Sequence, residues 1–236
     1  MNKIKTIIID DERLAREEIK TLISTWENIE IVAEAKNAIE AEKIINDHQP
    51  DLLFLDIQMP QRNGFELLES LDEAPEVIFV TAFDNYAIEA FNVSALDYIV
   101  KPIRKERFDQ CIQKAIAQIK TSQLEKKEET HQIFVKDAKK CYFIKLIEIS
   151  YIKSIGNYAQ LHFNNQSAMV KRTLNYLEKA LPTNFFRCNR SEIINHQFIS
   201  SIEPLPKGAL RVHLTTKQII DLSERRSVVF KEKLKL

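Results

Sequence analysis

The first half of the chain alternates between short, continuous apolar runs and stretches in which apolar residues recur every three or four positions. The apolar runs, which predict five strands, are residues 4–9, 29–35, 52–56, 77–81 and 98–100. The recurring apolar residues predict a helix after each strand, including a short one at 87–91. Nearly continuous apolar strands that alternate with helices are typical of a parallel sheet covered on both faces. We therefore predict an α/β doubly wound fold with a five-stranded parallel sheet.

Past residue 131 the pattern changes to the two-residue alternation of half-buried strands. Predicted strands are 132–135, 142–145, 150–154, 158–163, 185–188, 199–203, 209–214 and 219–221. Asn164-Asn165 and Pro206-Lys207-Gly208 are turn sequences between them. One helix is predicted, at 173–181, with Thr173 as its N-cap and Pro182 after its end. The second half is therefore predicted to be mostly β.

A charged run at 125–129 separates these two patterns and predicts a linker. We predict three parts: a first domain at 1–120, a linker at 121–131 and a second domain at 132–236. The formal net charge of the chain is zero, but residues 1–120 carry 14 Lys and Arg against 23 Asp and Glu, a net of −9. Residues 121–236 carry 20 against 11, a net of +9. The basic half is the candidate for binding nucleic acid.

Cysteine usage and apolar run lengths narrow the class of protein. Cys111, Cys141 and Cys188 are dispersed, which argues against a disulfide framework or a zinc site. Cys188 stands beside Arg187, so a reactive thiol and a buried thiol both remain open there. Neither a secretory leader nor a membrane-spanning run is recognised, so we expect a cytoplasmic protein with no membrane partner.

Polar residues capable of phosphoryl chemistry stand at the ends of four predicted strands. They are Asp10, Asp11, Asp56, Thr81 and Lys101. Because the carboxyl ends of parallel strands share one edge of the sheet, we expect these side chains to meet there. Clustered carboxylates need a cation, and oxygen ligands suit Mg²⁺. A carboxylate beside the metal is a candidate nucleophile toward a phosphoryl group.

Four motifs in this half resemble the response-regulator receiver domain, which has a flavodoxin-like fold. They are Ile-Ile-Ile-Asp-Asp-Glu (7–12), Leu-Asp-Ile-Gln-Met-Pro-x-x-Asn-Gly (55–64), Val-Thr-Ala (80–82) and Asp-Tyr-Ile-Val-Lys-Pro (97–102). The resemblance implies that Asp56 is the phosphoacceptor. It further implies a Mg²⁺ site formed by Asp10, Asp11, Asp56 and the Gln58 carbonyl, and a phosphate-sensing set formed by Thr81, Lys101 and the aromatic Tyr98. Gly64 suits a tight turn after Asp56, and Pro102 is a candidate for a cis peptide bond.

Each of these residues also has a purely structural interpretation. Asp10 or Asp11 is a candidate N-cap for the helix that begins near Glu12. Thr81 is a candidate cap for the helix near Asn85, and Lys101 alone is a solvated charge. Their joint occurrence, in order, at four strand ends favours the phosphoryl site.

The basic half shows no helix-turn-helix pattern and instead resembles the LytTR-type DNA-binding domain. The motifs are Ile-Gly-Asn-Tyr (155–158), Arg-Thr-Leu (172–174), Phe-Arg-Cys-Asn-Arg-Ser-Glu-Ile-Ile-Asn (186–195) and Ser-Glu-Arg-Arg (223–226). The resemblance implies that loops and strand ends contact DNA, with Asn157, Arg190 and Arg225 nearest the bases. It implies phosphate contacts by Lys171, Arg172, Arg187 and Arg226. Asn189 stands where the family commonly has histidine, which leaves the contact of that position open.

Two function classes follow from these resemblances. The first is a transcriptional regulator of a two-component system, phosphorylated on Asp56 by a sensor histidine kinase, which binds double-stranded promoter DNA and forms a homodimer on phosphorylation. The second is a signalling adaptor or phosphorelay intermediate whose C-terminal domain binds protein. A phosphatase is disfavoured, because Asp56-Ile57-Gln58 has no second carboxylate to serve as general acid. We expect no enzyme activity beyond slow self-phosphorylation and dephosphorylation at Asp56.

Overall fold

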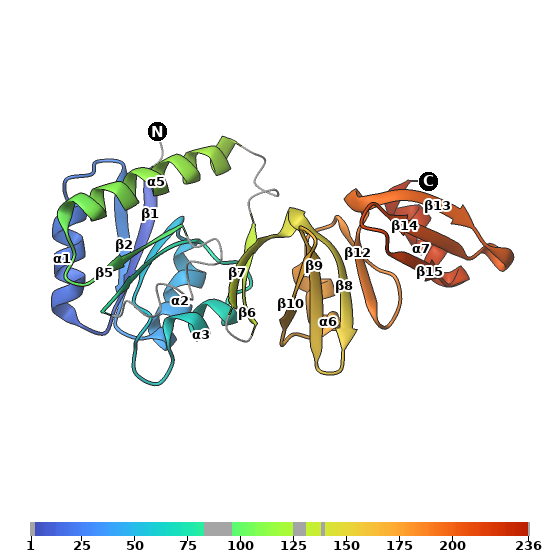
Figure 1. Cartoon of the computed structure of the whole chain (residues 1–236), viewed down its shortest axis with the longest axis horizontal. Coiled ribbons are helices and arrows are strands. Elements are labelled where there is room, and N and C mark those ends of the chain that lie inside the picture. The colour runs from blue at the N-terminus through green and yellow to red at the C-terminus, as the bar shows by residue number, and fades with distance from the viewer. Residues whose placement is uncertain (1–2, 83–95, 125–130, 138–139, 236) are drawn as a thin grey trace. The chain divides into compact units, whose positions relative to one another are not determined.

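The chain forms two compact units, Met1–Phe143 and Ile144–Leu236, in a computed structural model that describes residues 3–82, 96–124, 131–137 and 140–235 (Figure 1). The first unit contains a parallel five-stranded sheet in the order β2-β1-β3-β4-β5. Its strands are β1 Ile4–Ile9, β2 Ile29–Ala35, β3 Leu52–Leu55, β4 Glu76–Thr81 and β5 Asp97–Val100. The predicted parallel sheet is confirmed.

Helices cover both faces of this sheet, because successive strand residues point to opposite sides. The helices described are α1 Arg13–Ile23, α2 Ala38–His48, α3 Gly64–Ser70 and α5 Lys105–Leu124. Ile8 of β1 packs in one apolar cluster with residues of α1 and α5. Its neighbours Ile7 and Ile9 pack in the other cluster with residues of α2 and α3. The sheet is therefore doubly wound, as predicted, while the predicted helix at 87–91 lies outside the described residues.

A hairpin that follows α5 completes the core of the first unit. Its strands are β6 Gln132–Asp137 and β7 Lys140–Lys145. The Phe134 ring stacks on Phe65 of α3 with 5.9 Å between centroids and meets Phe143 edge-on at 5.0 Å. The Ala74 amide donates to the Gln132 carbonyl at 2.8 Å. The compact units thus divide after Phe143, whereas the predicted second domain starts at residue 132. Alternation in a strand shows that one face is buried, but not which neighbour buries it.

The second unit contains an antiparallel five-stranded sheet, a three-stranded sheet and two α-helices among its described residues. The larger sheet has the order β10-β9-β8-β12-β11 and the smaller one the order β13-β14-β15. The strands are β8 Ile149–Ile155, β9 Tyr158–Phe163, β10 Gln166–Val170, β11 Phe185–Arg187, β12 Glu192–Asn195, β13 Ile199–Pro204, β14 Leu210–Leu214 and β15 Ile219–Leu222. One apolar cluster joins Phe186 and Ile194 of the larger sheet to Val212 of the smaller sheet and to Phe230.

The two helices of this unit are α6 Leu174–Ala180 and α7 Glu224–Leu234. Helix α6 is the predicted one, and the Thr173 hydroxyl accepts a hydrogen bond from the Tyr176 amide as its cap. Helix α7 corrects the prediction of a single helix and puts Arg225 and Arg226 in a first helical turn. Its apolar stripe is weak, because only Ser227 and Phe230 are buried. Strands β10 and β12 were also not predicted.

Candidate functional site

Three carboxylates converge at the carboxyl edge of the parallel sheet. Asp10 and Asp11 follow β1, and Asp56 follows β3. One carboxylate oxygen of each lies within 4.8 Å of the other two. Asp10 is fully buried and Asp56 is 6% exposed, whereas Asp11 is exposed. The expectation that these groups meet at one edge is confirmed, and one member of the cluster opens to solvent.

The Lys101 ammonium lies between two of these carboxylates. Its Nζ is 2.8 Å from Asp10 Oδ2 and 2.9 Å from Asp56 Oδ2. Burial opposes the charge on this lysine, but the close carboxylates of Asp10 and Asp56 outweigh that effect and raise the Lys101 pKa. Burial also raises the pKa of Asp10, against the opposing effect of Lys101. Lys101 is therefore a fixed positive charge in the cluster, which excludes its interpretation as a solvated surface lysine.

Short backbone contacts hold the acidic residues in place. Asp10 Oδ1 accepts from the Glu12 amide at 2.9 Å, and Asp56 Oδ1 accepts from the Gln58 amide at 3.0 Å. Glu12 is the N-cap of α1 and makes no side-chain cap hydrogen bond. The prediction that Asp10 or Asp11 caps this helix is therefore wrong: Asp10 Oδ1 accepts from the amide of the cap residue Glu12, while Asp10 Oδ2 faces Lys101. Arg16, which we did not predict, donates to the Asp10 carbonyl at 2.7 Å and fixes the end of β1 from helix α1.

Gly64 allows the start of helix α3 to pack closely against the backbone of Asp56. A Cβ at this position would lie 2.5 Å from the Asp56 carbonyl oxygen. The residue begins helix α3, whose capping box is formed by Asn63 and Glu66. The prediction of a tight turn at Gly64 therefore needs correction, because the approach of α3 to the Asp56 backbone excludes a side chain here.

The donor set fits a divalent, oxygen-seeking cation. Asp10, Asp11 and Asp56 supply carboxylate oxygens only, the ligands that Mg²⁺ prefers. Asp10 Oδ2 is buried and, although close to the Lys101 ammonium, has no well-aligned hydrogen bond among the described residues. An oxygen buried in this way has capacity for a metal ligand bond. Gln58 is exposed beside the cluster, as its predicted carbonyl ligand role requires.

Thr81 and Tyr98 lie on the last two strands of the parallel sheet. Thr81 is fully buried at the end of β4, and its carbonyl accepts from the Lys101 amide at 2.8 Å. Tyr98 is half-buried on β5. Arg107 of α5 donates to the Tyr98 carbonyl at 2.9 Å, and its guanidinium carbon lies 5.9 Å from the Tyr98 ring centroid. Arg107 also pairs with buried Asp97. We did not predict Arg107, because no helical spacing rule links positions across a strand-to-helix turn.

Replacing Lys101 with alanine is expected to leave phosphorylation of Asp56 possible but to uncouple it from dimer formation. A phosphoryl group carries a charge near −2, and this ammonium is the cation already placed against Asp56. Sedimentation of the phosphodonor-treated protein measures the effect, with Lys5→Ala, an exposed lysine of the same unit, as control. Dimer formation by phosphorylated Lys101→Ala at the wild-type level contradicts this prediction.

The candidate DNA contacts lie mostly at one end of the larger sheet of the second unit. Strands β8, β10 and β11 end where β9 and β12 begin. Antiparallel pairing thus gathers the turn with Asn157, the segment 171–172 and the loop 188–191. The Ser154 amide donates to the Ser191 carbonyl at 2.8 Å, which joins the loop to β8. Arg226 hydrogen-bonds the Arg187 carbonyl, which joins the start of α7 to the same end.

The candidate DNA-contact residues fall into two groups: exposed side chains, and partly buried side chains that contact other parts of the protein. Asn157, Lys171, Arg190 and Arg225 are exposed. Arg172 is half-buried, with its guanidinium carbon 5.2 Å from the Tyr176 ring centroid. Arg187, Asn189 and Arg226 are also partly buried, and their side chains hydrogen-bond within the protein. The fold therefore brings the predicted DNA-contact residues together, but some of their side chains are exposed and others are partly buried and hydrogen-bonded within the protein.

Cys188 lies in this region as a buried thiol. It is fully buried, and burial raises its pKa to about 12. The charge of the neighbouring Arg187 lowers this pKa, but the loss of solvation dominates. The buried-thiol interpretation of Cys188 is therefore the one that the structure supports.

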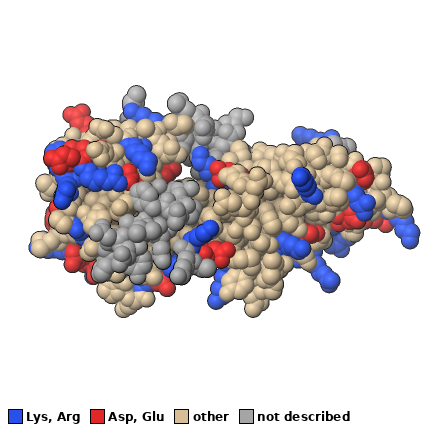
Figure 2. All heavy atoms as spheres, in the orientation of Figure 1, with Lys and Arg blue, Asp and Glu red and all other residues tan. Residues whose placement is uncertain are grey.

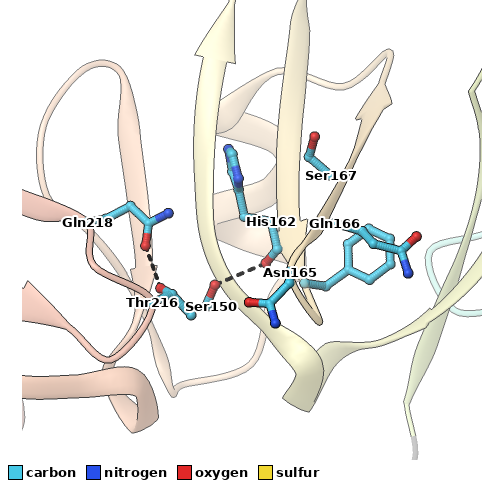
Figure 3. Close-up of a pocket in the computed structure, with 8 residues that line it drawn as sticks. Ser150, His162, Asn165, Gln166, Ser167, Thr216 and Gln218 are labelled. Carbon is cyan, nitrogen blue, oxygen red and sulfur yellow. Dashed lines mark hydrogen bonds between the residues drawn. The ribbon is translucent and has the colours of Figure 1, made fainter.

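A polar pocket of about 270 Å³ lies at the opposite end of the same sheet (Figure 3). Its lining comprises Ser150, His162, Phe163, Asn165, Gln166, Ser167, Thr216 and Gln218. The Ser150 hydroxyl donates to the His162 carbonyl at 3.1 Å, and Thr216 donates to Gln218. Burial, and then the charge of Lys153, lowers the pKa of His162. None of the predicted site residues lines this pocket.

The surface of the second unit agrees with its basic composition. Lys and Arg side chains project from several parts of it on the face that Figure 2 shows. In the part of the chain that the structure describes, no helix combines the length and apolar character needed to cross a bilayer.

Comparisons with known proteins match both halves of the chain. The response regulator receiver domain matches residues 6–113, and the LytTr DNA-binding domain matches residues 139–235. The sensory transduction protein LytT of Enterococcus faecalis is 36% identical over 238 residues, covering 98% of each chain. The transcriptional regulatory protein BtsR of Salmonella typhi is 31% identical over 240 residues, covering 99% of this chain and 100% of the relative.

Among solved structures, the response regulatory domain of mrkE from Klebsiella pneumoniae is 34% identical and covers 50% of this chain and 99% of its own, with a TM-score of 0.47. The two family matches occupy the two halves in the order that the sequence motifs predicted. The relatives align along nearly the whole chain. The chain therefore belongs to the response regulators that carry a receiver domain followed by a LytTr DNA-binding domain.

Proposed function

We propose that this protein is a DNA-binding transcriptional regulator controlled by phosphorylation of Asp56, with a sensor histidine kinase as the phosphodonor. The observation that carries the proposal is the buried contact of Lys101 with both Asp10 and Asp56. A lysine between two carboxylates at the edge of a parallel sheet prepares Asp56 for an anionic substituent. Because such a regulator works where the DNA is, the cytoplasm is its proposed location.

In the proposed transfer, an Asp56 carboxylate oxygen attacks the phosphorus of a phosphohistidine. The new P–O bond forms as the P–N bond breaks, and the imidazole leaves with the bond's electron pair. Asp10, Asp11, Asp56 and the Gln58 carbonyl would hold Mg²⁺, which would supply positive charge to neutralise the carboxylates and the incoming phosphoryl group. Lys101 provides a second positive charge 2.9 Å from Asp56 Oδ2. Slow loss of the phosphoryl group to water completes the cycle.

The phosphoryl group then acts through Thr81 and Tyr98. The new oxygens attract the Thr81 hydroxyl and the Lys101 ammonium, and movement of Thr81 frees space for the Tyr98 ring. Contacts between Tyr98 and Arg107 connect β5 to α5. A change in the position of the Tyr98 ring would therefore alter the surface formed by β5 and α5. We propose that the altered face pairs with the same face of a second molecule.

Dimer formation would strengthen DNA binding by placing two LytTr-type domains side by side. A single domain offers a small set of base contacts, so useful affinity requires a second one at high effective concentration. The proposed operator is a tandem site whose half-sites lie about one or two helical turns apart.

Footprinting on a site selected from random DNA tests the proposed function. With acetyl phosphate and Mg²⁺, the protein is expected to protect two half-sites, and without phosphodonor to bind more weakly. A protected single half-site with no gain on phosphorylation contradicts the proposal. Absence of sequence-specific, salt-sensitive binding under all conditions would favour a phosphorelay or adaptor role.

A further inference from the structure

The loop 188–191 is held in one shape by an arginine beneath it. Arg187, the last residue of β11, donates from Nε to the Asn189 carbonyl at 2.5 Å and from an Nη to the Arg190 carbonyl at 2.6 Å. Its other Nη lies 3.9 Å from Glu178 of α6. The guanidinium thus bridges two successive carbonyls of the loop. The Arg187 side chain is only 12% exposed, so little of it is available to a DNA phosphate.

Asn189 connects the same loop to the sheet through its side chain. Its Oδ1 accepts from the Ser191 amide at 2.8 Å, and its Nδ2 donates to Glu192 Oε2 at 2.6 Å. The other Glu192 oxygen accepts from the Tyr151 hydroxyl at 2.5 Å. Tyr151 lies on β8 and is 5% exposed. Both oxygens of Glu192 are therefore committed to the loop and to the strand that supports it.

A second arginine supports the base of the loop from α7. Arg226 hydrogen-bonds the Arg187 carbonyl, and its guanidinium carbon lies 4.7 Å from the Phe186 ring centroid. It also shares Glu178 with Arg187, at 3.9 Å from each guanidinium. These contacts use both arginines to join β11, α6 and α7 around the loop. Arg190, by contrast, is exposed.

We propose that Arg187, Asn189 and Arg226 are positioning residues, which hold the loop 188–191 so that Arg190 is presented to the base edges of DNA. The inference rests on the proposed DNA-binding function and changes the role of these three residues within it. A bidentate arginine contact with guanine requires a defined backbone position. A loop ordered before binding also avoids the entropy cost of ordering it on the DNA. The Asn189 side chain has the bracing role at the position where the family commonly has histidine.

Arg187→Lys separates a positioning role from a phosphate contact. Lysine keeps the charge but cannot bridge two carbonyls with a planar fork. On the selected site, this variant is expected to bind about tenfold more weakly, because hydrogen bonds from a charged group are lost. On random DNA it is expected to match the wild type, with an unchanged salt dependence. If Arg187→Lys binds both the selected and the random DNA nearly as tightly as the wild type does, the positioning role is overturned, because a phosphate contact tolerates lysine.

Tyr151→Phe is the second variant, since a residue buried on β8 cannot touch DNA in this fold. It removes one hydroxyl and keeps the ring, so it is expected to weaken specific binding in the same direction with random DNA unaffected. Amide hydrogen exchange in segment 188–192 is expected to accelerate in both variants. If Tyr151→Phe changes neither the amide hydrogen exchange of segment 188–192 nor the affinity for the selected site, the inference is also overturned. This outcome is decisive even if Arg187→Lys does not fold.

Arg211→Lys is the matched control. Arg211 makes a bidentate pair with Asp221, at 2.7 and 2.9 Å, between β14 and β15 of the smaller sheet in the same unit. Its replacement is expected to leave both DNA affinities and loop exchange at wild-type values. If wild-type protein shows no sequence-specific binding, the proposed function fails; if it binds and the loop variants bind equally well, only the positioning role fails.

Discussion

Replacing Asp56 with asparagine is expected to abolish uptake of a phosphoryl group from acetyl phosphate in the presence of Mg²⁺. The amide has neither the negative charge of the nucleophile nor a ligand oxygen of equal strength for the metal. Asp56 also supplies the oxygen that lies 2.9 Å from Lys101 Nζ, so its neutralisation removes the partner that this ammonium holds. Intact-mass measurement before and after treatment detects one added phosphoryl group in the wild type and none in the variant.

Asp51→Asn is the matched control, because Asp51 precedes the same strand at the opposite edge of the sheet. Its carboxylate accepts from the Lys5 amide at 2.8 Å and does not belong to the acidic cluster. This variant is expected to gain the phosphoryl group as the wild type does. An equal phosphoryl adduct on Asp56→Asn would contradict the assignment of Asp56 as phosphoacceptor. If chelation of Mg²⁺ left the phosphorylation rate unchanged, the proposed role of the metal would be wrong.

Replacing Arg190 or Arg225 with alanine is expected to cost ~1–3 kcal/mol of binding free energy on the selected site and little on random DNA. Both side chains are exposed beside the segments that meet at one end of the sheet. Loss of a base contact removes discrimination, whereas loss of a phosphate contact weakens all DNA alike. Titrations of labelled selected and random duplexes at several salt concentrations measure both effects.

Lys171→Ala and Arg172→Ala provide the contrast. These residues are expected to contact phosphates, so each variant should weaken both DNAs and flatten the salt slope by about one unit. Arg172 is in addition packed against the Tyr176 ring, which makes Lys171 the cleaner of the two. Equal losses on selected and random DNA for Arg190→Ala would move Arg190 from the base contacts to the phosphate contacts.

Much of the receiver half is determined by local sequence alone. The run before Asp56 is continuously apolar and the run before Asp10 nearly so, which is the pattern of strands buried on both faces, and such strands lie parallel. Parallel strands share a carboxyl edge, so the approach of Lys101 to Asp56, 45 residues away, follows from a topological rule. The side chains that support the site, Arg16 and Arg107, do not follow from that rule, because the rule places strand ends and not the side chains of the covering helices.

In the DNA-binding half, the sequence pattern predicts most strands but not how they pack. Its alternating strands and α6 follow from the pattern, but alternation does not specify which strands pair or which unit covers a given face. Only the tertiary structure decided that Phe134 of β6 packs on Phe65 within the first unit. Only the tertiary structure placed Arg226 against the Arg187 carbonyl, 39 residues away, and so separated the arginines that hold the loop from Arg190, which faces solvent. The sequence by itself determined which residues carry the charge and the chemistry. Three-dimensional packing decided which of those charges face solvent, because the Arg187 and Arg226 guanidinium groups are partly buried against backbone carbonyls, whereas the Arg190 side chain is exposed.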